Sequence, residues 1–380
     1  MANVKLSNVI RRAQTKVDKD DTDLVFYVGG EHIESENIRV HSRGIIAEST
    51  IGPMFYYGFK AGDFLLVSRN PHLKKAGLVD FDGICSEKTF VLETANSDVL
   101  LPEFLPFVLQ NERFWDYAYR HRHGSTNTFI NWSTLANYEF ELPDLETQRK
   151  LAEVLWSIND TMEAYKNLIS ATDELVKSQF MEQFGDPSNN VYGYPVTTLK
   201  EVAVGPLSYG SVSSATEFDG ITRYVRITDI MDDGNLGGDI KSATKTDAKY
   251  LLHEGDILFA RTGATVGKTC RYRENYGRAI YAGFLIRLIP DTTLIDPDYL
   301  YHFTKSDYYW DFVRSAQRVV AQPNINAQEY GDLQILLPKI EAQKSFAAFV
   351  QQSDKSKFEL EQALAELNAT YKRIIAENLG

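Results

Sequence analysis

The segment GATVGKT at residues 263–269 is the part of this sequence that most resembles a nucleotide-binding loop. It ends in Gly-Lys-Thr, the part of a P-loop that holds phosphates and a magnesium ion. The first glycine of that pattern would fall at Thr262, and the following TCRYRENYG does not resemble the required helix. We therefore expect no nucleotide site. A glycine-rich turn between Arg261 and Lys268 fits close approach to nucleic-acid phosphates instead.

Other catalytic patterns are incomplete. Asn70-Pro71-His72-Leu73 resembles the Asn-Pro-Pro-aromatic element of adenine methyltransferases, but His72 breaks it and no glycine-rich cofactor loop precedes it. The strand and helix alternation of a doubly wound domain is also missing. The seven histidines show no triad or metal spacing, and Ser125 and Ser211 lie in no nucleophile elbow. We expect no catalytic residue and no metal site in this chain.

Two polar loops offer chemistry for reading bases, HRHGSTNTFINWSTL at 121–135 and RVVAQPNINAQEY at 318–330. Arginine can bind guanine edges, and asparagine or glutamine can bind adenine edges. A turn-forming role is the alternative for any single asparagine, and Asn131 and Asn326 fit a scaffold role. With the basic islands at Arg69–Lys75 and from Arg261 onward, the candidate DNA-binding residues are Arg69, Lys74, Lys75, Arg122, His123, Ser125, Asn127, Arg261, Thr262, Lys268, Arg271, Arg318, Gln322 and Asn324.

The charge distribution bears on this hypothesis in two ways. The net charge of −12 argues mildly against a nucleic-acid partner. Six basic residues nevertheless lie between Arg261 and Arg287, against the single acid Glu274, and such islands can form one basic face. A solvated strand and loop surface is the alternative explanation.

The composition is that of a soluble protein. Hydrophobic residues make up 43% of the chain, yet no stretch approaches the about 20 apolar residues of a membrane span, and no signal peptide is evident. We expect a cytoplasmic protein. Cys85 and Cys270 lie far apart without metal-binding spacing, so both are interpreted as buried thiols.

An internal repeat organises the chain. LPDLETQRKLAEV at 142–154 matches LPKIEAQKSFAAF at 337–349 with a shift of 195, which also relates Ile130-Asn131 to Ile325-Asn326. GDFLLVSR at 62–69 matches GDILFAR at 255–261 with a shift of 193 that falls to 192. The N-terminal thirds of the two halves match poorly. The repeat predicts two copies of one module.

A long stretch without proline or glycine follows each Leu-Pro and carries a heptad seam. The seam residues are Leu151, Leu155, Ile158, Met162, Tyr165, Ile169 and Val176 in the first copy, and Phe346, Val350, Leu360, Leu364, Leu367, Tyr371 and Ile374 in the second. We expect two long helices that pair antiparallel and hold the domains apart. Packing of each helix against its globular domain is the alternative.

The expected fold class is α+β, with two mixed α/β domains, two long helices in an antiparallel coiled coil, and pseudo-twofold symmetry. The expected divisions are a first domain at residues 1–143, a first helix at 144–184, a second domain at 185–338 and a second helix at 339–380. Gly185-Asp186-Pro187 would end the first helix.

The chain resembles the specificity subunit of type I restriction-modification systems. The resemblance rests on GDILFARTGATVGKT, on AQPNIN leading into ILLPKIEAQKSFA, and on LPDLETQRKLAEVL with a helix ending in KSQFMEQFGD. It implies two target recognition domains that read a bipartite DNA site, with the Arg261–Lys268 loop, Ser68, Arg69 and the loops before Pro143 and Pro338 facing DNA. The first half departs from the pattern, with SRNPHLKKAG in place of ARTGATVGK.

The resemblance also implies partners. Two modification subunits would supply adenine methylation with S-adenosylmethionine, and restriction subunits would supply nuclease activity and ATP-driven translocation with magnesium, in defence against foreign DNA. The chain itself would be a non-catalytic, DNA-binding subunit without a membrane partner. Two alternatives stay open: a specificity subunit of a related methylation-only or defence system, and a coiled-coil scaffold without DNA binding.

Overall fold

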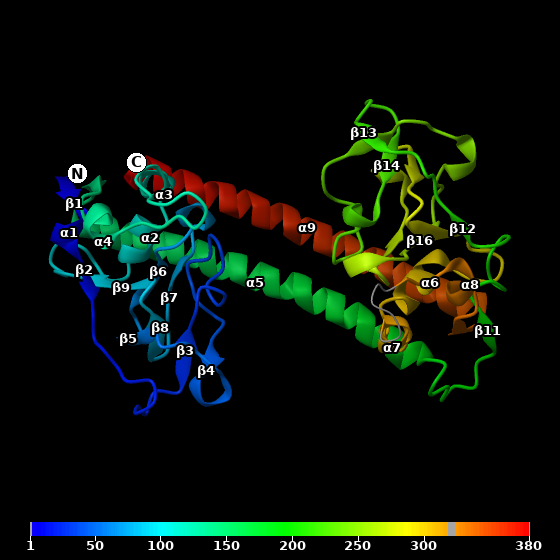
Figure 1. Cartoon of the computed structure of the whole chain (residues 1–380), viewed down its shortest axis with the longest axis horizontal. Coiled ribbons are helices and arrows are strands. Elements are labelled where there is room, and N and C mark those ends of the chain that lie inside the picture. Colours follow the sequence, from blue (N-terminus) through cyan, green and yellow to red (C-terminus); the bar gives the residue numbers. More distant parts are fainter. Residues whose placement is uncertain (1, 318–323, 380) are drawn as a thin grey trace. The chain divides into compact units, whose positions relative to one another are not determined.

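The structure is a computed structural model that describes residues 2–317 and 324–379. The chain forms two compact units, unit 1 with Met1–Lys166 and Gln362–Gly380, and unit 2 with Asn167–Glu361. The long helices α5 (Leu145–Phe184) and α9 (Ile340–Leu379) contribute residues to both units (Figure 1). Over the described ranges, no helix is both long enough and apolar enough to cross a membrane. These two units each contain part of both long helices, so they do not test the predicted division into two recognition domains and two spacer helices. That division stays a prediction.

Unit 1 contains three small sheets, with the strand orders β1-β10, β2-β9-β6-β7 and β4-β3-β8-β5. Its strands are β1 (Ala2–Lys5), β2 (Ile10–Ala13), β3 (Phe26–Val28), β4 (Gly44–Ile45), β5 (Phe55–Phe59), β6 (Phe64–Val67), β7 (Ala76–Leu78), β8 (Gly83–Ser86), β9 (Thr89–Thr94) and β10 (Glu139–Leu142). Its short helices are α1 (Leu6–Val9), α2 (Leu105–Leu109), α3 (Glu112–Arg120) and α4 (Trp132–Leu135).

Unit 2 has the strand orders β11-β20, β12-β19-β16-β17, β13-β15 and β14-β18, of which the first two correspond to β1-β10 and β2-β9-β6-β7 of unit 1. Its strands are β11 (Val196–Thr198), β12 (Ser208–Tyr209), β13 (Ala215–Glu217), β14 (Arg223–Val225), β15 (Lys241–Ala243), β16 (Ile257–Ala260), β17 (Thr269–Arg271), β18 (Ala279–Tyr281), β19 (Leu285–Leu288) and β20 (Gln334–Leu336). Its short helices are α6 (Pro297–Phe303), α7 (Asp307–Gln317) and α8 (Ala327–Gly331).

The internal repeat is confirmed in the strand pairing. In the two corresponding four-stranded sheets, β2-β9-β6-β7 and β12-β19-β16-β17, the central β6 and β16 pair antiparallel with both neighbours. Both units also contain one parallel pair, β3 with β8 and β14 with β18. The N-terminal thirds therefore share this parallel pair although their sequences match poorly, while the other strands of this region are arranged differently, as β4-β3-β8-β5 in unit 1 and as β13-β15 and β14-β18 in unit 2.

The long helices pair antiparallel within each unit. In unit 1, Leu155 near the start of α5 shares a buried cluster with Ile375 and Leu379 at the end of α9. In unit 2 the ends are exchanged, since Phe180 near the end of α5 lies 5.5 Å, between ring centroids, from Phe346 near the start of α9. All predicted seam residues are buried or half-buried. The antiparallel pairing is thus confirmed.

The helix ends also complete the globular cores, which was the alternative interpretation of the apolar stripe. In unit 1, Phe107 of α2 packs between Trp156 of α5 and Tyr371 of α9, at centroid distances of 5.1 and 6.2 Å. Phe180 and Ile375 lie outside the predicted seam yet are 3% and 4% exposed, because they face these cores. The apolar stripe on each helix therefore serves both the helix pair and the domain.

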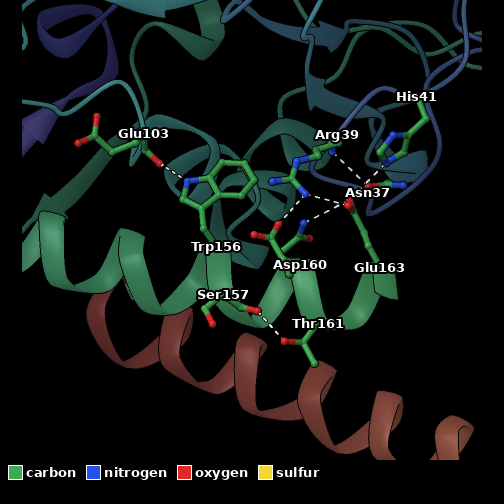
Figure 2. Close-up of polar contacts among 10 residues, drawn as sticks. Asn37, Arg39, His41, Glu103, Trp156, Ser157, Asp160, Thr161 and Glu163 are labelled. Carbon is green, nitrogen blue, oxygen red and sulfur yellow. Dashed lines mark hydrogen bonds and ion pairs between the residues drawn. The ribbon is translucent and has the colours of Figure 1, made fainter. Parts of the chain in front are cut away.

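Arg39 connects the sheet region of unit 1 to α5 through two ion pairs (Figure 2). Its Nη1 lies 2.7 Å from an oxygen of Asp160 and 2.8 Å from an oxygen of Glu163, and its guanidinium lies 4.8 Å from the ring centroid of Trp156. The Trp156 Nε1 donates to the carbonyl of Glu103 at 2.9 Å. One stacked arginine with two carboxylates therefore fixes this face of α5.

A buried glutamine fixes the start of each long helix. In unit 1, Gln148 Oε1 accepts from the amide of Leu101 at 3.0 Å, and its Nε2 donates to the carbonyls of Val99 and Pro143 at 2.9 and 2.8 Å. Both Gln148 and its counterpart in unit 2 are 0% exposed. We call this arrangement the glutamine clip, because it joins the first turn of the helix to a loop of the domain.

The same clip recurs in unit 2 with every residue shifted by 195. Gln343 Oε1 accepts from the amide of Asp296 at 2.8 Å, and its Nε2 donates to the carbonyls of Leu294 and Pro338 at 3.1 and 2.8 Å. The glutamine shared by LETQ and IEAQ is thus explained by three backbone groups that need partners in the interior.

We predict that Gln343→Leu lowers the free energy of unfolding by about 2 kcal/mol, because it leaves the partly buried amide of Asp296 and carbonyl of Leu294 and the buried carbonyl of Pro338 without their partner. Urea titration followed by circular dichroism measures the loss. Gln352→Leu, at an exposed position of the same helix, is the control and should change stability by less than about 0.5 kcal/mol. Equal effects of the two variants would contradict the role of the clip.

Candidate nucleic-acid interface

The glycine-rich segment of unit 2 is a tight loop between two strands. It leaves the buried β16 at Arg261, forms a single 3-10 turn at Gly263–Thr265 and enters β17, so no helix follows it. Gly263 and Gly267 have φ values of +72° and +89°, and a Cβ on Gly267 would lie 2.6 Å from a methyl group of Val313. The glycines are therefore required by backbone conformation and by packing against α7.

Arg261 is oriented by two neighbours at the base of this loop. Its guanidinium lies 4.7 Å from the ring centroid of Tyr209, and its Nε donates to Asn324 Oδ1 at 3.1 Å. The backbone of Thr262 forms an antiparallel bridge with Asn324. The structure thus brings the glycine-rich loop together with the end of the polar loop before Pro338.

The other basic residues between 261 and 287 divide into surface and interior groups. The Lys268 ammonium lies 2.6 Å from a carboxylate oxygen of exposed Asp232, which lowers the pKa of Asp232. Arg278 is exposed. Arg273 pairs with Asp354 at 2.8 Å, and Arg287 donates to the carbonyl of Leu251 at 2.6 Å.

Arg271 belongs to the interior group, which corrects its place among the DNA-binding candidates. Its side chain is 12% exposed, and its guanidinium lies 3.0 Å from Asp298 and 3.2 Å from Glu254. Burial raises the pKa of Asp298, although Arg271 and Arg273 act in the opposite direction. Arg271 therefore pairs with the buried carboxyl group of Asp298 and is not a surface residue.

In unit 1 the corresponding loops also meet. His123 and Phe129 exchange backbone hydrogen bonds at 2.7 and 2.9 Å and so close a hairpin, with Gly124 at φ +86°. Ser125 and Asn127 are exposed in this hairpin. Arg69, which is exposed, forms an antiparallel bridge with Phe129. The hairpin and Arg69 therefore share one surface.

Three further candidates in unit 1 are engaged by internal partners. Lys74 pairs with Glu36 at 3.2 Å and with Glu112 at 2.6 Å, and Lys75 donates to the carbonyl of Gly30 at 2.6 Å. The Arg122 guanidinium lies 3.7 Å from the ring centroid of Tyr119 and donates to the carbonyl of the same residue at 2.6 Å. Of these three, only Arg122 is held against an exposed aromatic ring.

Ser68 is a scaffold residue, and its position corrects the register of the repeat. It is 4% exposed, and its Oγ donates to the carbonyl of Lys88 at 2.7 Å. The amide of Ile130 donates to the Ser68 carbonyl just as the amide of Ile325 donates to that of Arg261, both at 2.9 Å. The shift of 193 therefore persists through the end of the strand, and Ser68, not Arg69, occupies the place of Arg261.

The remaining candidates belong to the polar loops that precede α4 and α8. Arg318 and Gln322 lie outside the residues that the structure describes. Asn326 is a helix cap, since its Oδ1 accepts from the amides of Gln328 and Glu329 at 2.9 and 3.0 Å. Asn131 stands at the same position before α4 but makes no side-chain cap bond. Within the described ranges, no group of three or more histidine, cysteine or acidic residues could hold a metal ion.

The two cysteines are buried, and burial raises the pKa of Cys85 and of Cys270 to about 12. Sequence reasoning missed Tyr209, which orients Arg261, and Phe284, which is 60% exposed beside it. Tyr209 lies in the third of the module where the halves match poorly, so no repeat signal could reveal it. Phe284 lies in an apolar run that indicates a core strand.

Comparison with known proteins agrees with the two-module organisation. A family model for the type I restriction modification DNA specificity domain matches residues 11–171 and again residues 195–369. The specificity subunit of the type I restriction enzyme HindI from Haemophilus influenzae is 26% identical over 132 residues. That match covers 33% of this chain and 28% of the relative, so it spans little more than a quarter of that protein.

Two solved structures share the fold over the whole chain. The S subunit of a type I restriction-modification system from M. genitalium has a TM-score of 0.61 at 14% identity, over 100% of this chain and 96% of that one. A chain from a study of complex assembly and conformational transition of the type I R-M system has a TM-score of 0.57 at 19% identity, over 99% and 97%. At these identities the likeness concerns the fold.

We predict that Arg271→Ala lowers the free energy of unfolding by about 3 kcal/mol at neutral pH, because it removes one partner of a buried ion pair. Arg278→Ala, at an exposed position, should cost less than about 0.5 kcal/mol. Without Arg271 the pKa of Asp298 should rise further, so the native state binds this proton more readily than the unfolded state. Denaturation at several pH values should therefore show that the loss shrinks as pH falls through the pKa of Asp298. A loss that grows towards acid would contradict this account.

Proposed function

This chain belongs to the family of type I restriction-modification DNA specificity proteins, whose domain it contains twice, and we propose that it is the subunit that reads DNA sequence in such a system. The observation that carries the proposal is the pair of family matches, one on each repeat. The half-buried Arg261, whose guanidinium lies over Tyr209 beside the glycine-rich loop, also supports DNA binding, because arginine is a common ligand of nucleic acid.

We propose further that each unit reads one part of a bipartite site. Each has its own loop surface built on the same strand order: Arg69 with the 123–129 hairpin in unit 1, and Arg261 with Asn324 in unit 2. The two surfaces carry different side chains, as readers of different half-sites require.

Catalysis is assigned to partner subunits in this proposal. The chain would direct two modification subunits, with S-adenosylmethionine, and restriction subunits, with ATP and magnesium, to the site. The loop at 263–269 supports this assignment, because it turns into strand β17 and lacks the glycine and the helix that a phosphate cradle needs.

We predict that the purified chain alone shows no methyltransferase, nuclease or ATPase turnover, whereas addition of the modification subunits restores methylation. Radiolabelled methyl transfer, plasmid cleavage and phosphate release are the measurements. Turnover by the chain without partners would refute the assignment.

Electrophoretic titration of the chain with random duplex at several salt concentrations tests DNA binding itself, since each phosphate contact contributes about 0.9 to the slope of log affinity against log salt. Arg261→Ala with Lys268→Ala should flatten this slope by about 0.9 to 1.8 units. The smaller value is expected if Asp232 keeps Lys268 from DNA.

Lys355→Ala removes the same type of charge from an exposed position on α9 and serves as the control. It should leave the slope unchanged. Salt-independent or absent binding by the unaltered chain would favour the scaffold alternative, and a normal slope for the double variant would place this loop away from DNA.

A further inference from the structure

A small backbone frame in unit 1 joins three segments that lie far apart in the sequence. The amide of Ile130 donates to the carbonyl of Ser68 at 2.9 Å, and the amide of Ser68 donates to the carbonyl of Lys88 at 2.7 Å. The neighbouring Arg69 forms an antiparallel bridge with Phe129. Residues 68, 88 and 129 are thereby held side by side, and we call these three positions the loop frame.

Unit 2 contains the same loop frame. The amide of Ile325 donates to the carbonyl of Arg261 at 2.9 Å, the amide of Arg261 donates to the carbonyl of Phe284 at 3.1 Å, and Thr262 bridges Asn324. Positions 261, 284 and 324 therefore correspond to 68, 88 and 129. The hydrogen bonds that hold the backbone are the same in both units.

Residues that support the frame keep their identity between the units. Asp63 accepts from the amide of Lys60 at 2.7 Å, and Asp256 accepts from the amide of His253, also three residues before it, at 3.0 Å. The amide of Val67 donates to the carbonyl of Lys75, and that of Ala260 donates to that of Lys268. The pairs of identical residues are Asp63 and Asp256, Lys75 and Lys268, and Ile130 and Ile325.

The loop frame itself exchanges its side chains completely. Serine, lysine and phenylalanine stand at positions 68, 88 and 129, whereas arginine, phenylalanine and asparagine stand at 261, 284 and 324. A contact that only positions DNA phosphates would be useful in both units and would carry no sequence information. An unchanged backbone with exchanged side chains is what two readers of different sequences need.

In unit 2 two side chains of the frame are exposed and the third, Arg261, is half-buried, and all three are of types that can contact base edges. Phe284 is 60% exposed, and Asn324 is exposed. Arg261 is fixed by Tyr209 and by its Nε bond to Asn324, and among the described residues its two Nη groups have no hydrogen-bond partner. A guanidinium can donate twice to guanine, an asparagine can bind adenine, and a phenyl ring can contact the methyl group of thymine.

In unit 1 the frame offers a different set. Ser68 is 4% exposed, and its hydroxyl donates to the carbonyl of Lys88. The Ser68 side chain is therefore not available at the surface. The Lys88 side chain is 45% exposed, and its ammonium lies 2.6 Å from a carboxylate oxygen of Glu87. Phe129 is 39% exposed. This frame therefore presents one aromatic ring and one lysine that is paired with Glu87.

We propose that the loop frame is the specificity-determining element of each unit, with Arg261, Phe284 and Asn324 reading bases of one half-site and Lys88 and Phe129 reading bases of the other. This inference rests on the proposed function and adds to it the residues that distinguish the two half-sites. It also explains why the repeat keeps its scaffold while these five side chains differ.

The test exchanges a frame residue for the one that the other unit carries at the same backbone position. Complexes of the full chain with its modification subunits are purified with wild-type sequence, with Phe284→Lys and with Asn324→Phe. Each selects bound duplexes from a randomised library, which are then sequenced. Because both positions are exposed and the new residue already fits an equivalent frame, both variants should fold, and thermal unfolding checks this.

Each variant should change base preference at one or two neighbouring positions of one half-site, with discrimination there falling about tenfold to a hundredfold. The other half-site should keep its sequence and is the internal control. Phe358→Lys, which alters a phenylalanine of α9 that is 58% exposed, should leave both half-sites unchanged.

Reduced binding with both half-site sequences intact would overturn the inference, because it would mean that the frame only positions the DNA. A change in both half-sites, or none with either variant, would overturn it as well. If the wild-type complex selects no sequence at all, the proposed function fails, and this outcome is distinct from failure of the frame alone.

Discussion

The amide of a buried glutamine at the start of each long helix is the interaction on which the rest of the arrangement depends. Its three hydrogen bonds join the first helical turn to a loop of the domain and to the Leu-Pro segment before the helix. With that turn fixed, the apolar stripe of the helix faces the domain core, and residues such as Phe180 and Ile375 are buried there. The same glutamine makes the same three contacts in both units. It is favoured there because backbone groups left without hydrogen-bond partners inside the protein lower its stability.

Such a fixed scaffold leaves the surface loops free to differ. The residue after the strand that ends at Val67 or at Ala260 lies at the same place in each unit, and the same backbone hydrogen bonds join it to neighbouring segments. These backbone hydrogen bonds are the same in both units although the side chains at these positions differ. This separation of support from recognition is consistent with a family whose members share a fold at low identity.

Much of this architecture could be predicted from the sequence, because the repeat and the heptad seam are periodic over long stretches. Helix α5 spans Leu145–Phe184, where proline and glycine mark both ends. The candidate site could be predicted less well, because the partners of its side chains lie far away in the sequence. Arg271 and Asp298 are 27 residues apart in the sequence yet 3.0 Å apart in the fold, so a basic run included an interior arginine. The place of Ser68 opposite Arg261 became visible only through backbone hydrogen bonds.

We propose that this one chain, with its two specificity domains, reads a DNA site in two parts. Methylome sequencing of cells that express this chain with its own modification subunits tests it most directly. The account predicts one methylated motif with two defined parts separated by unspecified bases. A single uninterrupted motif, or methylation without sequence preference, would contradict it.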